Sequence, residues 1–583
     1  MKKPGHKSAP GKDKKTTSRG QAQPQTWEDY MEGERYGTGE KAKRYYEKAG
    51  DMYNKACRLN PDDSDCLYNL GRVLYILVDL TPSATEKLKL LDASIERFRS
   101  AVSIDSDNVD TLYNLGQALT THADLLLDGV EEDHDEDEDD EDDDDDDHKH
   151  VHGHGDPQER AAGELQEAIA LFERCYVIQQ KELNSAVKEA YSGKDSGSKS
   201  NADSVPKVLD EEEQQELSSS AGVLVETLIS ASQALTSLAF LVDTVVRSQK
   251  YYQQAEEKLD VALRIANDKL LWPASTESQS SKGKGKGVTV EVTDFDASDD
   301  IVPATRPVST FREAEAKSEV VSQEEKLCDV HLQYSNLLTS QSNRFYQDTN
   351  QIPEAISKRA LQHLNTVLTH RPRHVEALCD KGDLLGTWAQ TLAATDKSSV
   401  SASDIEKSDS GSLDYGTSAV VAAEPSAKGD DKDTVSNKVW RLFASATRAF
   451  LSALDVEPQN TSILEKLGDI HWSRSQLKSA VAIKNRPMLL NNASVYYRFA
   501  WESCKEGADD MVDQDQRLEI LMSWAQVLHK IPNKEEDVIR VLKQWKRLGG
   551  TMDLLDELMD DPHQEILQKE FIMFVMELLA KSK

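Results

Sequence analysis

The stretch Ala49–Leu77, AGDMYNKACRLNPDDSDCLYNLGRVLYIL, decides the fold of this chain. Ala49, Tyr53 and Ala56 stand at positions i, i+4 and i+7, which places them on one face of a helix. Pro61 follows five residues after Ala56, and the sequence LYNLG then begins a second apolar stripe. The spacing therefore predicts two helices joined by a turn, each with one apolar face.

The same pattern returns in Arg97–Leu119, RFRSAVSIDSDNVDTLYNLGQAL. Phe98 and Ala101 continue the first stripe, and a second LYNLG ends at Gly116 as the first ended at Gly71. A small–large–small helix, a turn and L-x-x-L-G resemble the tetratricopeptide repeat, a helix–turn–helix unit of about 34 residues. The resemblance implies an all-α, right-handed superhelix of about seven divergent repeats, whose first helices line a concave wall.

Alanine and glycine in this pattern are expected where two helices cross, because only a very small side chain lets the backbones approach. An aromatic residue between them fills the gap to the next repeat. The expected signature residues are Ala49, Tyr53, Ala56, Gly71, Phe98, Ala101, Gly116, Ala446, Phe450, Ala453 and Gly468.

Composition divides the chain into helical and low-complexity segments. We expect a disordered basic tail over 1–26, repeats one to three over 27–128, a disordered Asp/Glu/His-rich insert over 129–157, repeats three and four over 158–270, a linker over 271–311, repeats five and six over 312–395, a linker over 396–435, repeats six and seven over 436–510, and capping helices over 511–583. In repeat two the sequence LTPSATEKLKLL is expected to form an extra loop or turn between the helices.

The chain is strongly acidic, with 104 Asp and Glu against 69 Lys and Arg and a net charge of −35. The charge is concentrated in one tract of 17 residues, 16 of them acidic, that includes Glu131, Glu132, Asp133, Asp142 and Asp147. Such a tract cannot fold, because like charges repel. Direct nucleic-acid binding is disfavoured and a basic protein partner is favoured. The tract is interpreted either as a shield for a basic client or as a solubilising spacer.

The two LYNLG sequences suggest a partner-binding groove on the first helices of repeats two and three. Tyrosine and arginine are frequent in interface hot spots, and asparagine can bond a peptide backbone in two directions. The alternative is that these side chains serve packing within each repeat. The candidate groove residues are Tyr68, Asn69, Arg72, Tyr75, Tyr113, Asn114 and Gln117.

The sequence predicts no enzyme and no cofactor, because it contains no phosphate-binding loop, nucleophile elbow or H-E-x-x-H motif. In HKHVHGHGD the residues His148, His150, His152 and His154 alternate, which suits adventitious metal binding more than a built site. The six cysteines are scattered without a C-x-x-C pair, which favours buried thiols in a reducing compartment. No signal peptide or membrane span is expected, so a cytoplasmic and/or nuclear protein is predicted.

The predicted function is a non-enzymatic scaffold or adaptor that binds a peptide or helix of a protein partner in the concave groove. One alternative is an escort chaperone that uses its acidic tract to hold a basic client such as a histone or ribosomal protein. A second alternative is an adaptor like an organelle-import receptor. The sequence LTTHAD and the insertion in repeat two are similar to the plant outer-membrane import receptor, although no membrane anchor is expected.

Overall fold

The computed structural model describes residues 39–128, 156–191, 209, 211–242, 244–272, 322–395, 435–505, 514–555 and 568–581. Sixteen helices have both ends among these residues, and none of these residues lies in a strand, which confirms the all-α prediction. The predicted basic tail, the acidic tract, the histidine segment and most of the predicted linkers lie outside them. The chain forms two compact units, residues 1–178 (unit 1) and 179–583 (unit 2), and the division falls within helix α6.

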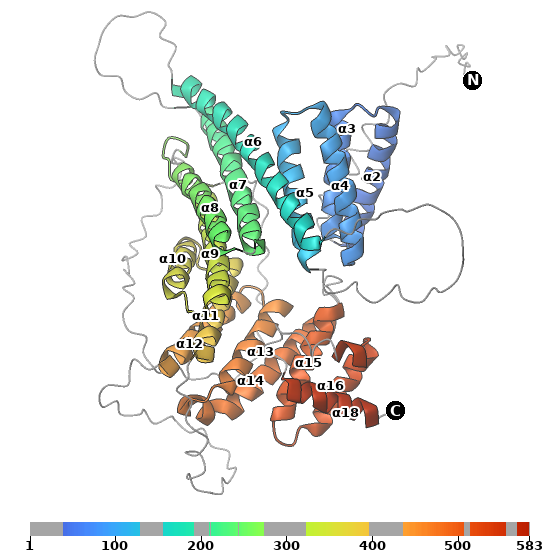
Figure 1. The fold of residues 1–583 in the computed structure, drawn as a ribbon, viewed down its shortest axis with the longest axis vertical. Coiled ribbons are helices and arrows are strands. Elements are labelled where there is room, and N and C mark those ends of the chain that lie inside the picture. The colour runs from blue at the N-terminus through green and yellow to red at the C-terminus, as the bar shows by residue number, and fades with distance from the viewer. Residues whose placement is uncertain are drawn as a thin grey trace, which may run out of the picture. The chain divides into compact units, whose positions relative to one another are not determined.

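Unit 1 is built from consecutive antiparallel helices. They are α2 (Glu40–Leu59), α3 (Ser64–Asp79), α4 (Ala84–Ile104), α5 (Val109–Asp128) and the first part of α6 (Pro157–Tyr191). Helices α2 and α3, α3 and α4, and α4 and α5 pack against one another, and α3 also contacts α5 (Figure 1). The first helices of repeats two and three are therefore neighbours, as a stacked repeat requires.

Unit 2 repeats this arrangement. Its helices are α7 (Glu211–Leu241), α8 (Val245–Ala266), α9 (Gln323–Thr349), α10 (Glu354–His370), α11 (Val375–Thr395), α12 (Val435–Leu454), α13 (Thr461–Gln476), α14 (Ala480–Lys505), α15 (Gln514–Lys530), α16 (Glu535–Arg547) and α18 (Lys569–Lys581). The hairpins pair α7 with α8, α9 with α10, α11 with α12, α13 with α14 and α15 with α16. Each hairpin also packs on the next one along the chain.

In four of the hairpins a glycine of the first helix faces an aromatic ring of the second helix. A Cβ atom added at the glycine would lie 2.9 Å or less from the ring, so any larger residue must push the helices apart. The pairs are Gly71 with Phe98, Gly116 with Phe172, Gly382 with Phe450, and Gly468 with Tyr497. All four rings are buried, with 1% exposure or less. The close approach of backbones is therefore the physical basis of the repeat.

The other signature residues differ in how deeply they lie. Ala49, Ala101, Ala446 and Ala453 are fully or almost fully buried. Tyr53 and Ala56 are only partly buried and pack at the edge of the cluster around Cys57, Leu67 and Leu70.

Helix starts follow local capping chemistry. The side chains of Asp63, Asn108 and Asn460 accept hydrogen bonds from the backbone N–H groups of Cys66, Thr111 and Ile463 at 3.0, 2.9 and 3.1 Å. Each of these acceptors satisfies one of the donors that the first turn of a helix leaves unpaired. Three first helices of the repeats therefore begin by the same device.

The prediction of an extra loop or turn over LTPSATEKLKLL is right for its first residues and wrong for the rest. A short turn ends at Ser83, and α4 begins at Ala84, so ATEKLKLL lengthens the second helix of the repeat. Ser83 is the N-cap and accepts a hydrogen bond from the backbone N–H of Glu86 at 3.4 Å. The spacing S-x-x-E is a capping box, a signal that was present in the sequence and outweighs Pro82 just before it.

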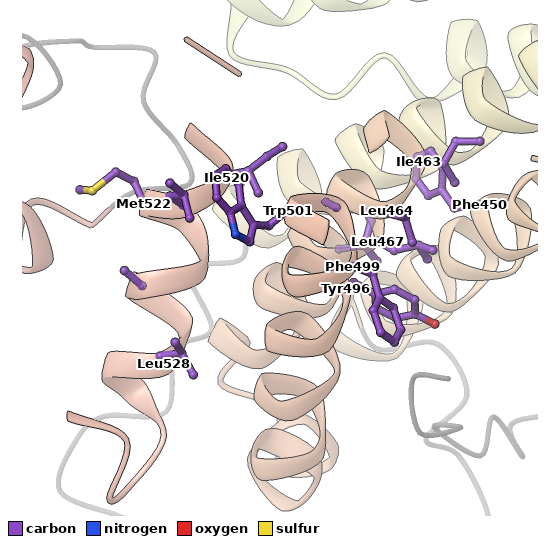
Figure 2. Packing of buried hydrophobic residues seen from close by; sticks show 14 of the residues in the cluster. Phe450, Ile463, Leu464, Leu467, Tyr496, Phe499, Trp501, Ile520, Met522 and Leu528 are labelled. Carbon is purple, nitrogen blue, oxygen red and sulfur yellow. The ribbon is translucent and has the colours of Figure 1, made fainter. Parts of the chain in front are cut away.

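The C-terminal helices complete a large hydrophobic cluster in unit 2. Figure 2 shows residues of this cluster that come from α12, α13, α14 and α15, such as Phe450, Leu467, Phe499 and Ile520. Buried residues of α16 and α18 belong to the same cluster. The last hairpins are therefore continuous with the core of the repeats before them.

Helix α7 is long and apolar enough to cross a membrane by length and composition alone, with a mean hydropathy of 1.4 over its most apolar window. In the structure 61% of that window is buried, and α7 packs against both α8 and α9. Its apolar surface therefore serves packing inside unit 2.

All six cysteines are free thiols, and all but Cys379 are buried. The Sγ atoms of Cys57, near the end of α2, and Cys66, in the first turn of α3, lie 2.9 Å apart. Burial raises the pKa of the Cys66 thiol, and its hydrogen bond to Cys57 raises it further.

Candidate partner-binding site

The predicted groove residues lie together on α3 and α5, and we call them the α3–α5 wall. Asn114 donates from Nδ2 to the Tyr68 hydroxyl at 3.4 Å, and the hydroxyls of Tyr75 and Thr121 are 3.0 Å apart. Both contacts join residues that are 46 positions apart in the sequence. The structure thus brings neighbouring first helices together through polar side chains.

The amide groups of this wall are held in place by short-range bonds. Asn69 and Asn114 each donate to the backbone carbonyl four residues earlier, at 2.7 Å, and Gln117 donates to the Tyr113 hydroxyl at 2.8 Å. All seven wall residues are half-buried. Side chains that are fixed before a partner arrives lose little rotamer freedom on binding.

Aromatic rings support the wall from behind. The Tyr68 and Phe98 ring centroids are 6.0 Å apart, and those of Tyr113 and Phe172 are 5.8 Å apart with an edge-to-face geometry. Burial raises the pKa of Tyr68 and of Tyr75, so both phenols stay protonated and can donate hydrogen bonds. These residues therefore combine a packing role with a half-exposed polar edge.

A polar network lies between α4, α5 and α6, around the histidine of LTTHAD. His122 is fully buried, and its Nδ1 atom is 2.6 Å from the Glu164 carboxylate, while Nε2 is 3.4 Å from that of Asp92. Arg160 contacts both carboxylates, at 2.9 Å to Asp92 and 3.1 Å to Glu164. The network joins three helices and has a structural role.

Unit 2 has an equivalent wall that the sequence reasoning missed. The repeat glycine gives the register, and the wall positions are those three and two residues before it and one residue after it. In α3 and α5 these positions hold Tyr68, Asn69 and Arg72, and Tyr113, Asn114 and Gln117; in α11 and α13 they hold Cys379, Asp380 and Asp383, and Glu465, Lys466 and Asp469. We call Asp380, Asp383, Glu465, Lys466 and Asp469 the α11–α13 wall.

The carboxylates of this wall are only partly compensated. Lys466 and Asp383 form an ion pair at 3.1 Å, Tyr497 donates to Asp469 at 2.5 Å, and Gln516 donates to Glu465 at 2.9 Å. The Oδ2 atom of Asp380 is buried and has no hydrogen-bond partner among the described residues. Lys466 is the wall's one cation.

Burial shifts the acidity of these groups. It raises the pKa of Asp380 to about 7, and the nearby Glu376 and Asp383 carboxylates add to the shift. It also raises the pKa of Glu465 and of Asp469 to about 7, although Gln516 and Tyr497 hydrogen bonds oppose it. A cationic group placed here would restore part of the solvation that these carboxylates lose on folding.

The described residues contain no group of three or more His, Cys, Asp and Glu side chains that could hold a metal ion. The closest histidine pair is His331 and His363, whose Nδ1 atoms are 2.8 Å apart between α9 and α10. Tyr334 stacks on the His363 ring, with centroids 4.5 Å apart. The predicted acidic tract and histidine segment lie in the undescribed part of the chain.

Residues 40–141 match the family model of the plant-specific mitochondrial import receptor subunit TOM20. This range covers α2 to α5 and therefore the whole α3–α5 wall. No curated protein matches the chain in sequence.

Several solved structures resemble the chain weakly. The nuclear import adaptor Nro1, a hypoxic regulator of sterol synthesis, is 12% identical, with 86% of this chain and 99% of that chain covered and a TM-score of 0.30. The human IFIT1 dimer with m7Gppp-AAAA is 11% identical, with 91% and 81% covered and a TM-score of 0.25. The TPR domain of P58(IPK) is 10% identical, with 89% and 98% covered and a TM-score of 0.16. Likenesses this low carry no argument about function.

The fold itself rests on the helical hairpins, the four glycine–aromatic contacts and the matched family model. The described helices form hairpins that resemble tetratricopeptide repeats, and residues 40–141 match an import-receptor family model.

Proposed function

We propose that the chain is a non-enzymatic adaptor that holds an extended segment of a protein partner against the α3–α5 wall. The observation that supports this most directly is the ordered polar surface across two repeats, with Asn114 bonded to Tyr68 and Tyr75 bonded to Thr121. Hydroxyl and amide groups on neighbouring first helices can bond a peptide backbone, while the tyrosine rings pack against its side chains.

The proposal is tested by an affinity pull-down with the full chain and a wall variant. Arg72→Glu combined with Gln117→Glu adds negative charge at half-buried wall positions without removing a buried ring. The partners retained by the native chain should be lost with this variant. Arg58→Glu is the matched control, because Arg58 is exposed at the end of α2. If both variants keep the same partners, the wall does not bind them.

A second candidate function is escort of a basic protein. It is supported by the α11–α13 wall, whose carboxyl groups are desolvated and have only Lys466 as a cation among them, and by the net charge of −35. The test is deletion of residues 131–147 and, separately, Asp380→Asn with Glu465→Gln, followed by measured association with histones at increasing salt. An affinity that neither change alters would exclude this function.

A third candidate function is reception of proteins destined for an organelle. The matched family model over residues 40–141 favours it. Mitochondrial transit peptides are amphipathic and arginine-rich, so a fluorescent peptide of that kind should bind the full chain and its scrambled version should not. Equal binding of the two peptides would reject this candidate.

A further inference from the structure

Unit 2 contains a large cavity that the sequence did not reveal. Its volume is about 960 Å³, and its walls come from α9 to α14 and from Gln568 before α18. A cavity of this size can hold several residues of an extended peptide. The described residues that line it include the aromatic side chains of Tyr346, Trp388, Phe443 and Trp472.

The lining is almost free of charge. Among the described residues that line the cavity there is no Asp, Glu, Arg or His, and Lys478 at the rim is the one charged side chain. The remaining polar groups are amides and hydroxyls, such as those of Asn343 and Gln390. In a chain with 104 acidic residues this composition is exceptional, and it favours an occupant whose buried part is uncharged.

The cavity continues the α11–α13 wall along the same two helices. On α11 the residues Asp380, Asp383, Thr387 and Thr391 follow one another at steps of three and four, which keeps them on one face. The first two belong to the acidic wall and the last two line the cavity. An acidic end and an uncharged end therefore share one face of this helix.

Helix α13 has the same order. Glu465 and Asp469 of the acidic wall are followed on the same face by Trp472 and Gln476, which line the cavity. The two helices contact each other, and the ion pair of Lys466 with Asp383 joins them. The acidic wall and the cavity thus follow one another along the same faces of α11 and α13.

From this arrangement we infer that α11 and α13 bind an extended segment of a partner protein that has two chemically distinct parts. Lysine or arginine side chains of the segment lie along Asp380, Asp383, Glu465 and Asp469, and an adjoining uncharged stretch with a bulky apolar side chain fills the cavity. Charge complementarity selects the first part, and the aromatic and amide lining selects the second. This site is separate from the α3–α5 wall, so either can fail while the other binds.

The experiment measures fluorescence anisotropy of labelled twelve-residue peptides with the full chain. The two-part peptide carries Lys-Arg-Lys followed by serine, asparagine, leucine and phenylalanine residues. The comparison peptides are wholly basic or wholly uncharged. The two-part peptide should bind at least about tenfold more tightly than either, because each comparison peptide loses one set of contacts.

Two changes in the chain separate the two halves. Asp380→Asn with Glu465→Gln should weaken the two-part peptide and leave the uncharged peptide unaffected. Ala394→Trp, at an exposed residue that lines the cavity, should weaken the two-part peptide and leave the wholly basic peptide unaffected. Gln476→Trp is a second variant that also fills the cavity from an exposed position.

The controls at exposed positions of unit 1 are Asp62→Asn, which removes one carboxylate, and Ala84→Trp, which adds the same ring. Equal affinity for the wholly basic and the two-part peptide would overturn the inference, because the cavity would then contribute nothing. Unchanged binding by both tryptophan variants would overturn it in the same way. Self-association of the native chain that Ala394→Trp abolishes would show that a second copy occupies the cavity instead.

Discussion

The α3–α5 wall and the α11–α13 wall are built on the same glycine–aromatic contact, but their partly exposed side chains differ in charge. In both, a glycine of the first helix receives an aromatic ring of the second, as with Gly116 and Phe172 or Gly382 and Phe450. One wall then presents tyrosine and asparagine, and the other presents carboxylates. The comparison teaches that packing positions define the repeat, whereas the positions beside them are free to define a partner.

The two walls also differ in how their polar groups are satisfied. On the α3–α5 wall Asn69 and Asn114 bond their own helices, and Tyr68 and Tyr75 bond the neighbouring helix. On the α11–α13 wall an oxygen of Asp380 is buried without a hydrogen-bond partner in the described residues. The α3–α5 wall is already hydrogen-bonded before a ligand arrives, whereas the α11–α13 wall has a buried oxygen that a ligand could satisfy.

The largest effect is expected for substitutions of the glycine that faces an aromatic ring in both walls. Gly116→Leu and Gly382→Leu should each lower the free energy of unfolding by about 2–3 kcal/mol through overpacking, because a Cβ atom would lie within 2.7 Å of the facing ring. Urea unfolding followed by circular dichroism measures the cost. Gly163→Leu is the control, because a Cβ atom at that helical glycine meets nothing within 4 Å. If either repeat variant behaves like the control, the two walls do not share one packing rule.

The next effect separates the hydroxyls of the two walls. Tyr497→Phe removes the donor to Asp469 and leaves a desolvated carboxyl group unsatisfied, which should cost about 2 kcal/mol. Tyr68→Phe loses only a 3.4 Å contact with Asn114, and the cost should be about 0.5 kcal/mol or less. Thermal unfolding compares the two variants. Equal costs would mean that the acidic wall is no more strained than the neutral one.

A reciprocal exchange at one wall position should have opposite outcomes. The pKa of Asp380 is raised above its unfolded value, because the folded protein disfavours the charged carboxylate. The resulting loss of stability is absent below the unfolded pKa of about 4 and is complete above the folded pKa of about 7. Asp380→Asn should therefore stabilise the protein by about 1–2 kcal/mol at pH 8 and by less at pH 5. Asn69→Asp places a carboxylate against the Asp65 carbonyl and should destabilise by about 1 kcal/mol. Urea midpoints at both pH values decide, and a gain independent of pH would contradict the mechanism.

The smallest expected effect concerns the half-buried histidine pair between α9 and α10, His331 and His363. Burial lowers the pKa of His363 to about 4, and the nearby His331 and Arg359 add to the shift. Burial also lowers the pKa of His331, with a smaller contribution from His370. Because the folded state disfavours protonation of the pair, the pair does not reduce stability above the unfolded pKa of about 6.5. Below that pH the free energy of unfolding falls, by about 1 kcal/mol at pH 5. Hydrogen exchange in α9 and α10 measures this loss.

The control is a variant that lacks the histidine of this pair whose pKa is lowered further. A variant with His363→Gln should remove most of the acid sensitivity of α9 and α10. If α9 and α10 of this variant open at the same pH as in the native chain, the assignment of the sensitive pair is wrong.

The fold was predictable because its determinants are local. Alanine, glycine and aromatic residues at fixed spacing predict a helical hairpin, and the structure confirms the all-α fold and the repeat resemblance. The extension of α4 was also encoded locally, in the capping box of Ser83 and Glu86, although a loop or turn was predicted there. The start of a helix depends on which of two competing signals is stronger.

The sites were less predictable because they depend on contacts between distant residues. The α3–α5 wall was found because LYNLG occurs twice, so the equivalence of its positions was visible. The acidic residues of α11 and α13 become equivalent only when Gly382 and Gly468 are aligned. The cavity joins residues from Thr339 to Gln568, and no periodicity in the sequence brings these together.

The thiols of Cys57 and Cys66 can report how often α2 and α3 separate at the turn that joins them. Cys57 and Cys66 are 7% and 8% exposed, one near the end of α2 and the other in the first turn of α3. An alkylating reagent reaches these thiols only when the end of α2 separates from the start of α3. The labelling rate therefore measures how often this turn opens locally. Mass spectrometry of the labelled chain would thus compare the opening rate of α2 and α3 before and after a partner is added, with no engineered probe.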